Sequence, residues 1–234
     1  MTEIAFGAVG EPIEATQRRV RLAARALGRH GLGHAFGHVS ARLDDDTFLV
    51  CAPRPMGTIA PGAAGTVVPV EGALPQGVLG EVRVHQQIYR RRPDVGGICR
   101  TFLAKVLTLS AMRLTPQPRH GFASYFAPAA PLWDSPLLLR NDADAAGLAE
   151  TLGAARAVVM RGNGCVLVGA SVEEAIVMAF FLEQAADTEL AVLAAGPGVD
   201  APVMSAEDCA ARAVATGGIY ERMWDWLTFG DPER

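Results

Sequence analysis

Residues 157–174, from which the fold class is most clearly predicted, read Ala-Val-Val-Met-Arg-Gly-Asn-Gly-Cys-Val-Leu-Val-Gly-Ala-Ser-Val-Glu-Glu. Ala157–Met160 and Cys165–Val168 are short apolar runs that predict buried strands, and Arg161-Gly162-Asn163-Gly164 between them predicts a turn. Ser171-Val-Glu-Glu174 is a capping box, which predicts the first turn of a helix. A strand, a turn, a second strand and a helix in succession indicate a mixed α/β protein.

Helices and short strands alternate along the rest of the chain. Apolar spacing and capping residues predict helices over Glu11–Gly31, Leu79–Arg92, Phe102–Met112, Asp142–Leu152, Ser171–Leu193 and Ser205–Leu227. Further strands are predicted over His38–Leu43, Thr47–Ala52, Thr66–Val70 and Val95–Cys99. The run Asp44-Asp45-Asp46 predicts a hairpin turn between the first two of these strands.

Together these elements predict one three-layer α/β/α domain over residues 1–234, with a mixed, partly antiparallel central sheet. The core of this domain is expected over about residues 13–195. The C-terminal helix, within residues 203–229, ends in aromatic side chains and is a candidate subunit contact.

The composition narrows the classes of protein to which the chain can belong. Its 234 residues have a mass of 24.6 kDa and are half apolar, which is enough for one sizeable core. The net charge is −4, and the 21 basic residues, all arginine except Lys105, form no continuous stripe. We therefore expect neither nucleic acid nor an anionic membrane as a partner.

The cysteines and the apolar stretches predict the compartment. No Cys-x-x-Cys pair occurs among the four cysteines, Cys51, Cys99, Cys165 and Cys209. We therefore expect buried free thiols in a reducing compartment. Residues 1–10 carry no basic region followed by an apolar stretch, which argues against a signal peptide, and Ala175–Leu182 is shorter than the about 20 residues that cross a bilayer. The expectation is a cytoplasmic protein.

Several motifs, taken in order, carry a family resemblance. They are Gly37-His-Val-Ser-Ala-Arg42, Glu81-x-x-x-His85-x-x-x-Tyr89, Arg92-Pro-Asp-Val95, and the Arg161–Ser171 stretch with its turn and strand. Over about residues 13–195 the chain resembles the class II aldolase and adducin-head family. The resemblance implies a helix-flanked mixed sheet, a divalent metal ion, commonly zinc, and retro-aldol cleavage or decarboxylation. The His at position 38 resembles the branch with aromatic decarboxylases and adducin-like proteins more than the sugar-phosphate aldolases.

The chain departs from the family at the three positions where the resemblance implies histidine ligands. These positions hold Arg100, Phe102 and Asn163. A guanidinium keeps its proton, a phenyl ring has no donor pair, and a neutral amide is a poor zinc ligand compared with imidazole. We therefore expect no metal ion at this place and no other cofactor.

Two residues are the candidate catalytic groups. Glu81 aligns with the carboxylate that serves the family as acid or base, and helical spacing predicts that Glu81, His85 and Tyr89 lie in a row on one helix face. Arg100 follows a short apolar strand at an end of the sheet where ligands of α/β folds bind. If the two are neighbours, as the resemblance implies, they pair, either as a structural replacement for the metal ion or to bind a substrate anion.

The candidate substrate-binding residues come from three segments. Strand alternation places His38, Ser40 and Arg42 on one side of a strand. His120 and Tyr125 lie in the irregular segment where the resemblance implies a histidine that faces the pocket. Asn163 belongs to the turn in the opening stretch.

The leading hypothesis is a metal-independent carbon–carbon lyase of the aldolase or decarboxylase kind, or an isomerase with enolate chemistry. Its substrate would be a small anionic, carboxylated or phenolic molecule, with Arg100 holding the anion and Glu81 moving the proton. The alternative is a non-catalytic, adducin-like oligomerisation or binding module, which a pocket plugged by Phe102 and Phe122 would favour. A second alternative is a metal-dependent lyase with relocated ligands, drawn from His38, His85, His120 and Glu81. The resemblance also implies a homo-oligomer, a tetramer, with sites at subunit boundaries.

Overall fold

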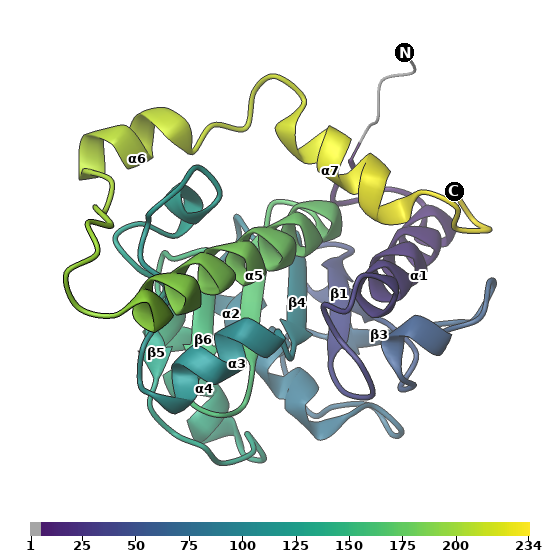
Figure 1. The fold of residues 1–234 in the computed structure, drawn as a ribbon. Helices are drawn as coiled ribbons and strands as arrows, with labels where there is room; N and C mark the ends of the chain where they lie inside the picture. Colours follow the sequence, from purple (N-terminus) through teal and green to yellow (C-terminus); the bar gives the residue numbers. More distant parts are fainter. Residues whose placement is uncertain (1–5) are drawn as a thin grey trace.

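The computed structural model describes residues 6–234; the expectation about the amino terminus falls partly on residues 1–5, which lie outside that range. A seven-stranded mixed sheet forms the middle of the structure (Figure 1). Its strands are β1 (His38–Arg42), β2 (Thr47–Val50), β3 (Thr66–Pro69), β4 (Gly97–Thr101), β5 (Leu132–Trp133), β6 (Ala157–Met160) and β7 (Cys165–Gly169).

The strand order across the sheet is β3-β2-β1-β4-β7-β6-β5. Neighbouring strands are antiparallel, apart from the parallel pair β5 and β6. The predicted hairpin between β1 and β2 is confirmed, and so are the two strands of the opening stretch, which pair across the Arg161–Gly164 turn. The mixed, partly antiparallel sheet was therefore predicted correctly.

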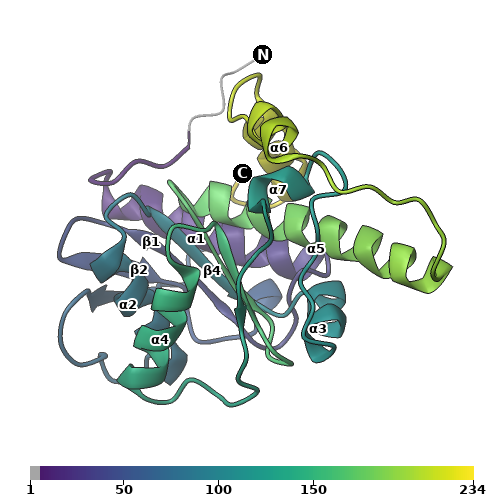
Figure 2. The same cartoon turned by 90° about the vertical axis from the view of Figure 1, so that its left-hand side faces the viewer.

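Helices cover both faces of the sheet and complete three layers (Figure 2). They are α1 (Ile13–Arg29), α2 (Arg83–Arg91), α3 (Ala104–Ala111), α4 (Asp142–Leu152), α5 (Val172–Ala195), α6 (Ala206–Arg212) and α7 (Ile219–Thr228). One apolar cluster joins the sheet to α1, α3, α5 and α7, and a second joins it to α2 and α4. Because both faces are covered, β1 and β4 are buried along their whole length.

The C-terminal helix was predicted wrongly as one element. The structure has two helices, α6 and α7, joined by residues 213–218. Gly217 and Gly218 have φ angles of 78° and 68°, in the left-handed region that a continuous right-handed helix does not allow. The chain therefore turns at this glycine pair before α7 packs against α5.

Three smaller corrections concern the part of the chain that positions the site. The helix expected over Leu79–Arg92 begins with a separate 3₁₀ turn, Gly80–Val82, before α2. The strand expected over Val95–Cys99 is β4, two residues further on, so Arg100 lies inside a strand and not beyond it. The two-residue strand β5 was missed because it falls in a segment that prolines interrupt.

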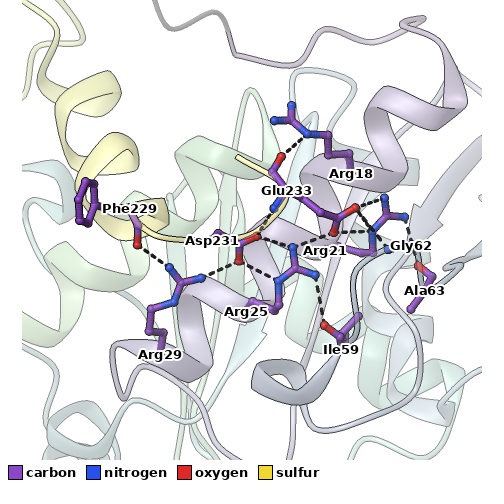
Figure 3. Close-up of polar contacts among 10 residues, drawn as sticks. All are labelled: Arg18, Arg21, Arg25, Arg29, Ile59, Gly62, Ala63, Phe229, Asp231 and Glu233. Carbon is purple, nitrogen blue, oxygen red and sulfur yellow. Dashed lines mark hydrogen bonds and ion pairs between the residues drawn. The ribbon is translucent and has the colours of Figure 1, made fainter.

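The end of the chain is tied to α1 by ion pairs (Figure 3). Arg25 and Arg29 bind the two carboxylate oxygens of Asp231, each at 2.6 Å. Arg21 binds Glu233 at 2.6 Å, and Arg25 reaches the same carboxylate at 2.8 Å. Asp231 is buried, so these contacts fix residues 229–234 along the helix.

All four cysteines are buried free thiols, as predicted. Burial raises the pKa of Cys51 to about 11 and that of Cys165 to about 12, so both thiols stay protonated at neutral pH. Within residues 6–234, no helix has the length and apolar character needed to cross a membrane.

Candidate active site

The pairing of β1 with β4 puts His38 beside Arg100. The two residues are directly opposite each other in the antiparallel register, so their side chains share one face of the sheet. That face is the one covered by α2, since Ser40 and Arg42, two and four residues after His38, both contact α2. The predicted common side of His38, Ser40 and Arg42 is therefore confirmed.

Arg100 is the largest side chain that is completely buried. Its Nη2 lies 3.4 Å from Oε2 of Glu81 and donates to Oδ1 of Asn163 at 3.2 Å. Its Nη1 donates to the carbonyl of Thr101 at 3.0 Å, and the guanidinium lies 4.3 Å from the centre of the Phe102 ring. Burial lowers the pKa of Arg100 from its ordinary value, and the negative charge of Glu81 opposes that shift. The predicted pairing of Glu81 with Arg100 is confirmed.

A glycine brings the Asn163 turn against Arg100. Gly164 has a φ of 74°, and a Cβ there would lie 2.3 Å from the carbonyl oxygen of Thr101 and 2.8 Å from Nη1 of Arg100. Any other residue would be strained by the backbone and pushed away from β4. The Gly-Asn-Gly sequence thus allows the Asn163 amide to reach the guanidinium.

A chain of hydrogen bonds runs from His38 into α2. Nδ1 of His38 lies 2.9 Å from Nε2 of His85, and Nδ1 of His85 lies 2.6 Å from the hydroxyl oxygen of Ser40. The Ser40 hydroxyl also lies 2.9 Å from the Tyr89 hydroxyl. Burial and the nearby Arg100 charge lower the pKa of His38 to about 3, and burial lowers that of His85 well below its usual range. Both imidazoles are therefore neutral at neutral pH.

The row predicted along the helix is correct only in part. His85 and Tyr89 do lie one turn apart on α2 and meet at Ser40. Glu81 is not in that row, because it belongs to the 3₁₀ turn before α2 and points to Arg100.

A cavity of about 840 Å³ opens beside these groups. Glu81, His38, Asn163 and Phe102 all line it, as do the exposed arginines Arg54 and Arg140. Arg100 does not line it, because the side chain is only 1% exposed and the Phe102 ring lies against the guanidinium. Phe102 therefore forms part of the wall without filling the cavity.

The remaining candidate residues lie away from this cavity in the single chain. Ser40 is engaged in the buried chain, and Arg42 donates to the carbonyls of Tyr89, Arg92 and Val95. His120 contacts Phe122, whose ring stacks on Phe181 of α5 at 4.3 Å, on the other face of the sheet. Tyr125 donates to the carbonyl of Val214 on that same face. The structure thus brings Glu81, Arg100, His38 and Asn163 together, and their roles remain predictions.

Two pocket residues were missed from the sequence. Arg54 follows β2 in a loop with two prolines, and Arg140 precedes α4. Neither forms an ion pair with another residue in the described part of the chain, residues 6–234. No local pattern distinguishes these two arginines from the other eighteen, because their shared position arises only from the fold.

The donors beside the cavity do not fit a divalent metal ion. The positively charged Arg100 is surrounded by the Glu81 carboxylate and the Asn163 oxygen, the two groups that a cation there would need. Across residues 6–234, no three His, Cys, Asp or Glu side chains are grouped so that they could hold a metal ion. Relocated ligands do not meet either, since His120 lies on the opposite face and both ring nitrogens of His85 are hydrogen-bonded.

The profile of the family described as the class II aldolase and adducin N-terminal domain matches residues 18–190. This chain belongs to that family. This class II aldolase-family chain is similar to the 3,4-dihydroxyphthalate decarboxylase of Terrabacter sp. (strain DBF63). The two are 29% identical over 88% of this chain and 92% of that protein. The 3,4-dihydroxyphthalate decarboxylase of Arthrobacter keyseri is 27% identical over 76% of this chain and 78% of that protein.

Solved structures support the same fold. An L-fuculose 1-phosphate aldolase from Glaciozyma antarctica PI12 superposes with a TM-score of 0.77 at 18% identity, over 97% of this chain and 94% of that one. An aldolase II superfamily protein from Pseudomonas syringae gives 0.75 at 22% identity, over 94% of this chain and 95% of that one. At these identities the likeness concerns the class II aldolase fold alone.

Proposed function

We propose that this class II aldolase-family protein is a carbon–carbon lyase of the decarboxylase kind, which acts without a bound metal ion on a small hydroxylated aromatic carboxylate. The decarboxylases that resemble it over most of their length support the reaction class. The observation that carries the proposal is the position of Glu81. Its side chain lines the cavity and is 23% exposed, its Oε2 is bound from behind by the buried Arg100 guanidinium, and its Oε1 is buried without a partner among residues 6–234.

Positive charge that forms no ion pair within residues 6–234 supports an anionic substrate at the cavity. Arg54 and Arg140 are both exposed on the cavity wall, and Glu81 is the only carboxylate among the described residues that line it. Because Glu81 is already paired with Arg100, the wall has net positive charge. Guanidinium groups bind carboxylates through two parallel hydrogen bonds, which suits a substrate that carries one or more carboxylates.

Decarboxylation requires the protein to move one proton and to stabilise negative charge on the aromatic ring. In an ortho-hydroxylated aromatic acid, removal of the phenol proton places negative charge on the ring carbon that bears the carboxylate. That carbon takes up a proton, the carbon–carbon bond breaks, CO₂ leaves, and the bonding pair returns to the ring. Glu81 is placed to accept and return the proton. Arg100 acts as a positioning residue, since it holds the carboxylate and contributes positive charge beneath the cavity without being exposed to it.

The donor set supports a metal-independent reaction, because Arg100 occupies the place between Glu81 and Asn163. The four free, buried thiols fit a reducing compartment, and we propose the cytoplasm as the place of action.

The proposal is tested by incubating the protein with 3,4-dihydroxyphthalate and following CO₂ release. We expect turnover by the wild type and a loss of about a hundredfold or more in Glu81→Gln, because the amide cannot take up a proton. Glu150→Gln, which changes an exposed glutamate on α4, serves as the matched control and should turn over normally. Binding of the compound without any CO₂ release would contradict the proposal and favour the non-catalytic binding module.

A further inference from the structure

The hydrogen-bond chain that ends at His38 has a preferred direction. Its four members are Tyr89, Ser40, His85 and His38, and each of the three contacts joins a possible donor to a possible acceptor. In one direction the Tyr89 hydroxyl donates to Ser40, the Ser40 hydroxyl donates to His85, and Nε2–H of His85 donates to Nδ1 of His38. In the opposite direction every proton is reversed, so His38 donates from Nδ1 and the Tyr89 hydroxyl becomes the last donor.

The two directions differ in which donor is left over. Tyr89 is 2% exposed, and Ser40 is the only hydrogen-bond partner of its hydroxyl among the described residues. The reversed chain would leave the buried Tyr89 O–H without an acceptor, which is a large penalty. The forward chain satisfies all of the buried donors except Nε2–H of His38. Each direction thus leaves one buried donor over, but His38 lines the cavity, where a bound molecule can accept its Nε2–H, whereas the Tyr89 O–H does not reach the cavity. The forward direction is therefore favoured when the cavity holds an acceptor.

The remaining donor belongs to a residue of the cavity wall. His38 is 3% exposed and lines the cavity, and its Nδ1 is turned to His85. Nε2, on the other edge of the ring, is buried and has no partner among residues 6–234. Nε of Arg100, on the register partner of His38, is a second buried donor without a partner.

We propose that His38 is a neutral hydrogen-bond donor, through Nε2–H, to the phenolic oxygen of the substrate, and that Tyr89, Ser40 and His85 are positioning residues that fix this tautomer. The substrate class rests on the function proposed above. A neutral donor stabilises the oxygen as negative charge develops on it and does not give up its own proton. Burial of both imidazoles keeps them uncharged across the neutral range, so the donor persists there.

The tautomer can be observed directly by ¹⁵N NMR of protein labelled in its five histidines. His38→Gln and His85→Gln identify the signals of the two residues. In the wild type we expect a protonated Nε2 and an unprotonated Nδ1 for His38. Adding 3,4-dihydroxybenzoate, a hydroxylated carboxylate probe, should shift Nε2–H of His38 and leave the signals of His30 unchanged. A His38 that carries its proton on Nδ1, or an Nε2–H that the bound probe does not shift, would overturn the proposal.

Ser40→Ala tests the positioning chain. Without the hydroxyl, His85 loses the group that distinguishes the two directions, so the His38 nitrogens should move toward the average of two tautomers. Ser124→Ala removes another buried serine hydroxyl, away from this chain, and should leave the tautomer unchanged. An unchanged His38 tautomer in Ser40→Ala would contradict the positioning role.

Turnover supplies a second readout. His38→Gln keeps a side-chain N–H donor and His38→Leu does not, so we expect the leucine variant to fall below the glutamine variant by about tenfold to a hundredfold in kcat/KM. Equal turnover of the two variants would overturn the donor role even if the wild-type protein is active. Conversely, the predicted tautomer with a shifted Nε2–H in a protein that releases no CO₂ would support the donor and contradict only the proposed reaction.

Discussion

Arg100 and Glu81 differ in how far each is shielded from water, and so in how costly it is to remove the partner of each. Among residues 6–234, the 1% exposed Arg100 side chain has the Asn163 and Thr101 oxygens as its only partners besides the Glu81 carboxylate, whereas the Glu81 side chain is 23% exposed at the cavity. A buried charge that loses its partner is more costly than a charge that water can still reach. Loss of the Glu81 carboxylate should therefore destabilise the folded protein more than loss of the Arg100 guanidinium.

This asymmetry predicts the ranking of three variants. We expect Glu81→Leu to lower the free energy of unfolding by about 3–5 kcal/mol and Arg100→Leu by about 1–3 kcal/mol. The double variant should recover most of the larger loss, because no unpaired charge remains. Urea unfolding measures all three. Arg90→Leu, which breaks the exposed pair with Glu71, is the control and should cost less than about 1 kcal/mol.

A reversed ranking of the two single variants would contradict the asymmetry. If the double variant were as unstable as Glu81→Leu, the loss of unfolding free energy would instead come from lost packing of the substituted side chains. The charges would then be irrelevant.

At the scale of elements, the last residues of the chain stabilise α1 through charge. Glu233 receives hydrogen bonds from Arg21 and Arg25, and these, with the Arg21 bond first, lower its pKa from 4.5 to about 2. A carboxyl whose pKa is lower in the folded state stabilises that state fully above its unfolded pKa. This contribution is lost as the pH falls from about 4.5 to about 2.

Glu233→Gln should therefore be less stable than the wild type at pH 6, by about 1–2 kcal/mol. The gap should narrow as the pH falls below 4.5 and nearly vanish close to pH 2. Chemical denaturation at a series of pH values measures it, and Glu207→Gln, an exposed substitution on α6, provides the baseline. A stability difference that is independent of pH would mean that the charge of Glu233 does not fix residues 229–234 to α1.

Local sequence patterns predicted the elements better than they predicted how distant parts meet. The two apolar runs around Gly-Asn-Gly were enough to predict β6 and β7, and the Ser171 cap was enough to predict the start of α5. The contact of residues 229–234 with α1 was not predicted, because Arg21 and Glu233 are 212 residues apart and no local rule pairs them. The family resemblance predicted the Glu81–Arg100 contact, whereas residue spacing alone misplaced Glu81 in the His85 row.

Across the whole protein, apolar surface remains exposed near the cavity and at the C-terminal end of α7. Phe36 and Leu138 of the cavity wall are 66% and 48% exposed, and Trp226 and Phe229 are 52% and 74% exposed. Large apolar side chains grouped at a surface are typical of subunit contacts. We propose a homo-oligomer, a tetramer as the family resemblance implies. A monomeric mass in light scattering at micromolar concentration would contradict it.

We propose that the Arg100 guanidinium stands where relatives are expected to hold a metal ion. Decarboxylation of 3,4-dihydroxyphthalate by protein purified without a metal-binding tag, with and without a strong chelator, tests it most directly. We predict equal rates of CO₂ release in both samples, and metal analysis should find less than one metal ion per site in the active protein. Activity that disappears with the chelator and returns with a divalent metal ion would contradict the proposed metal independence.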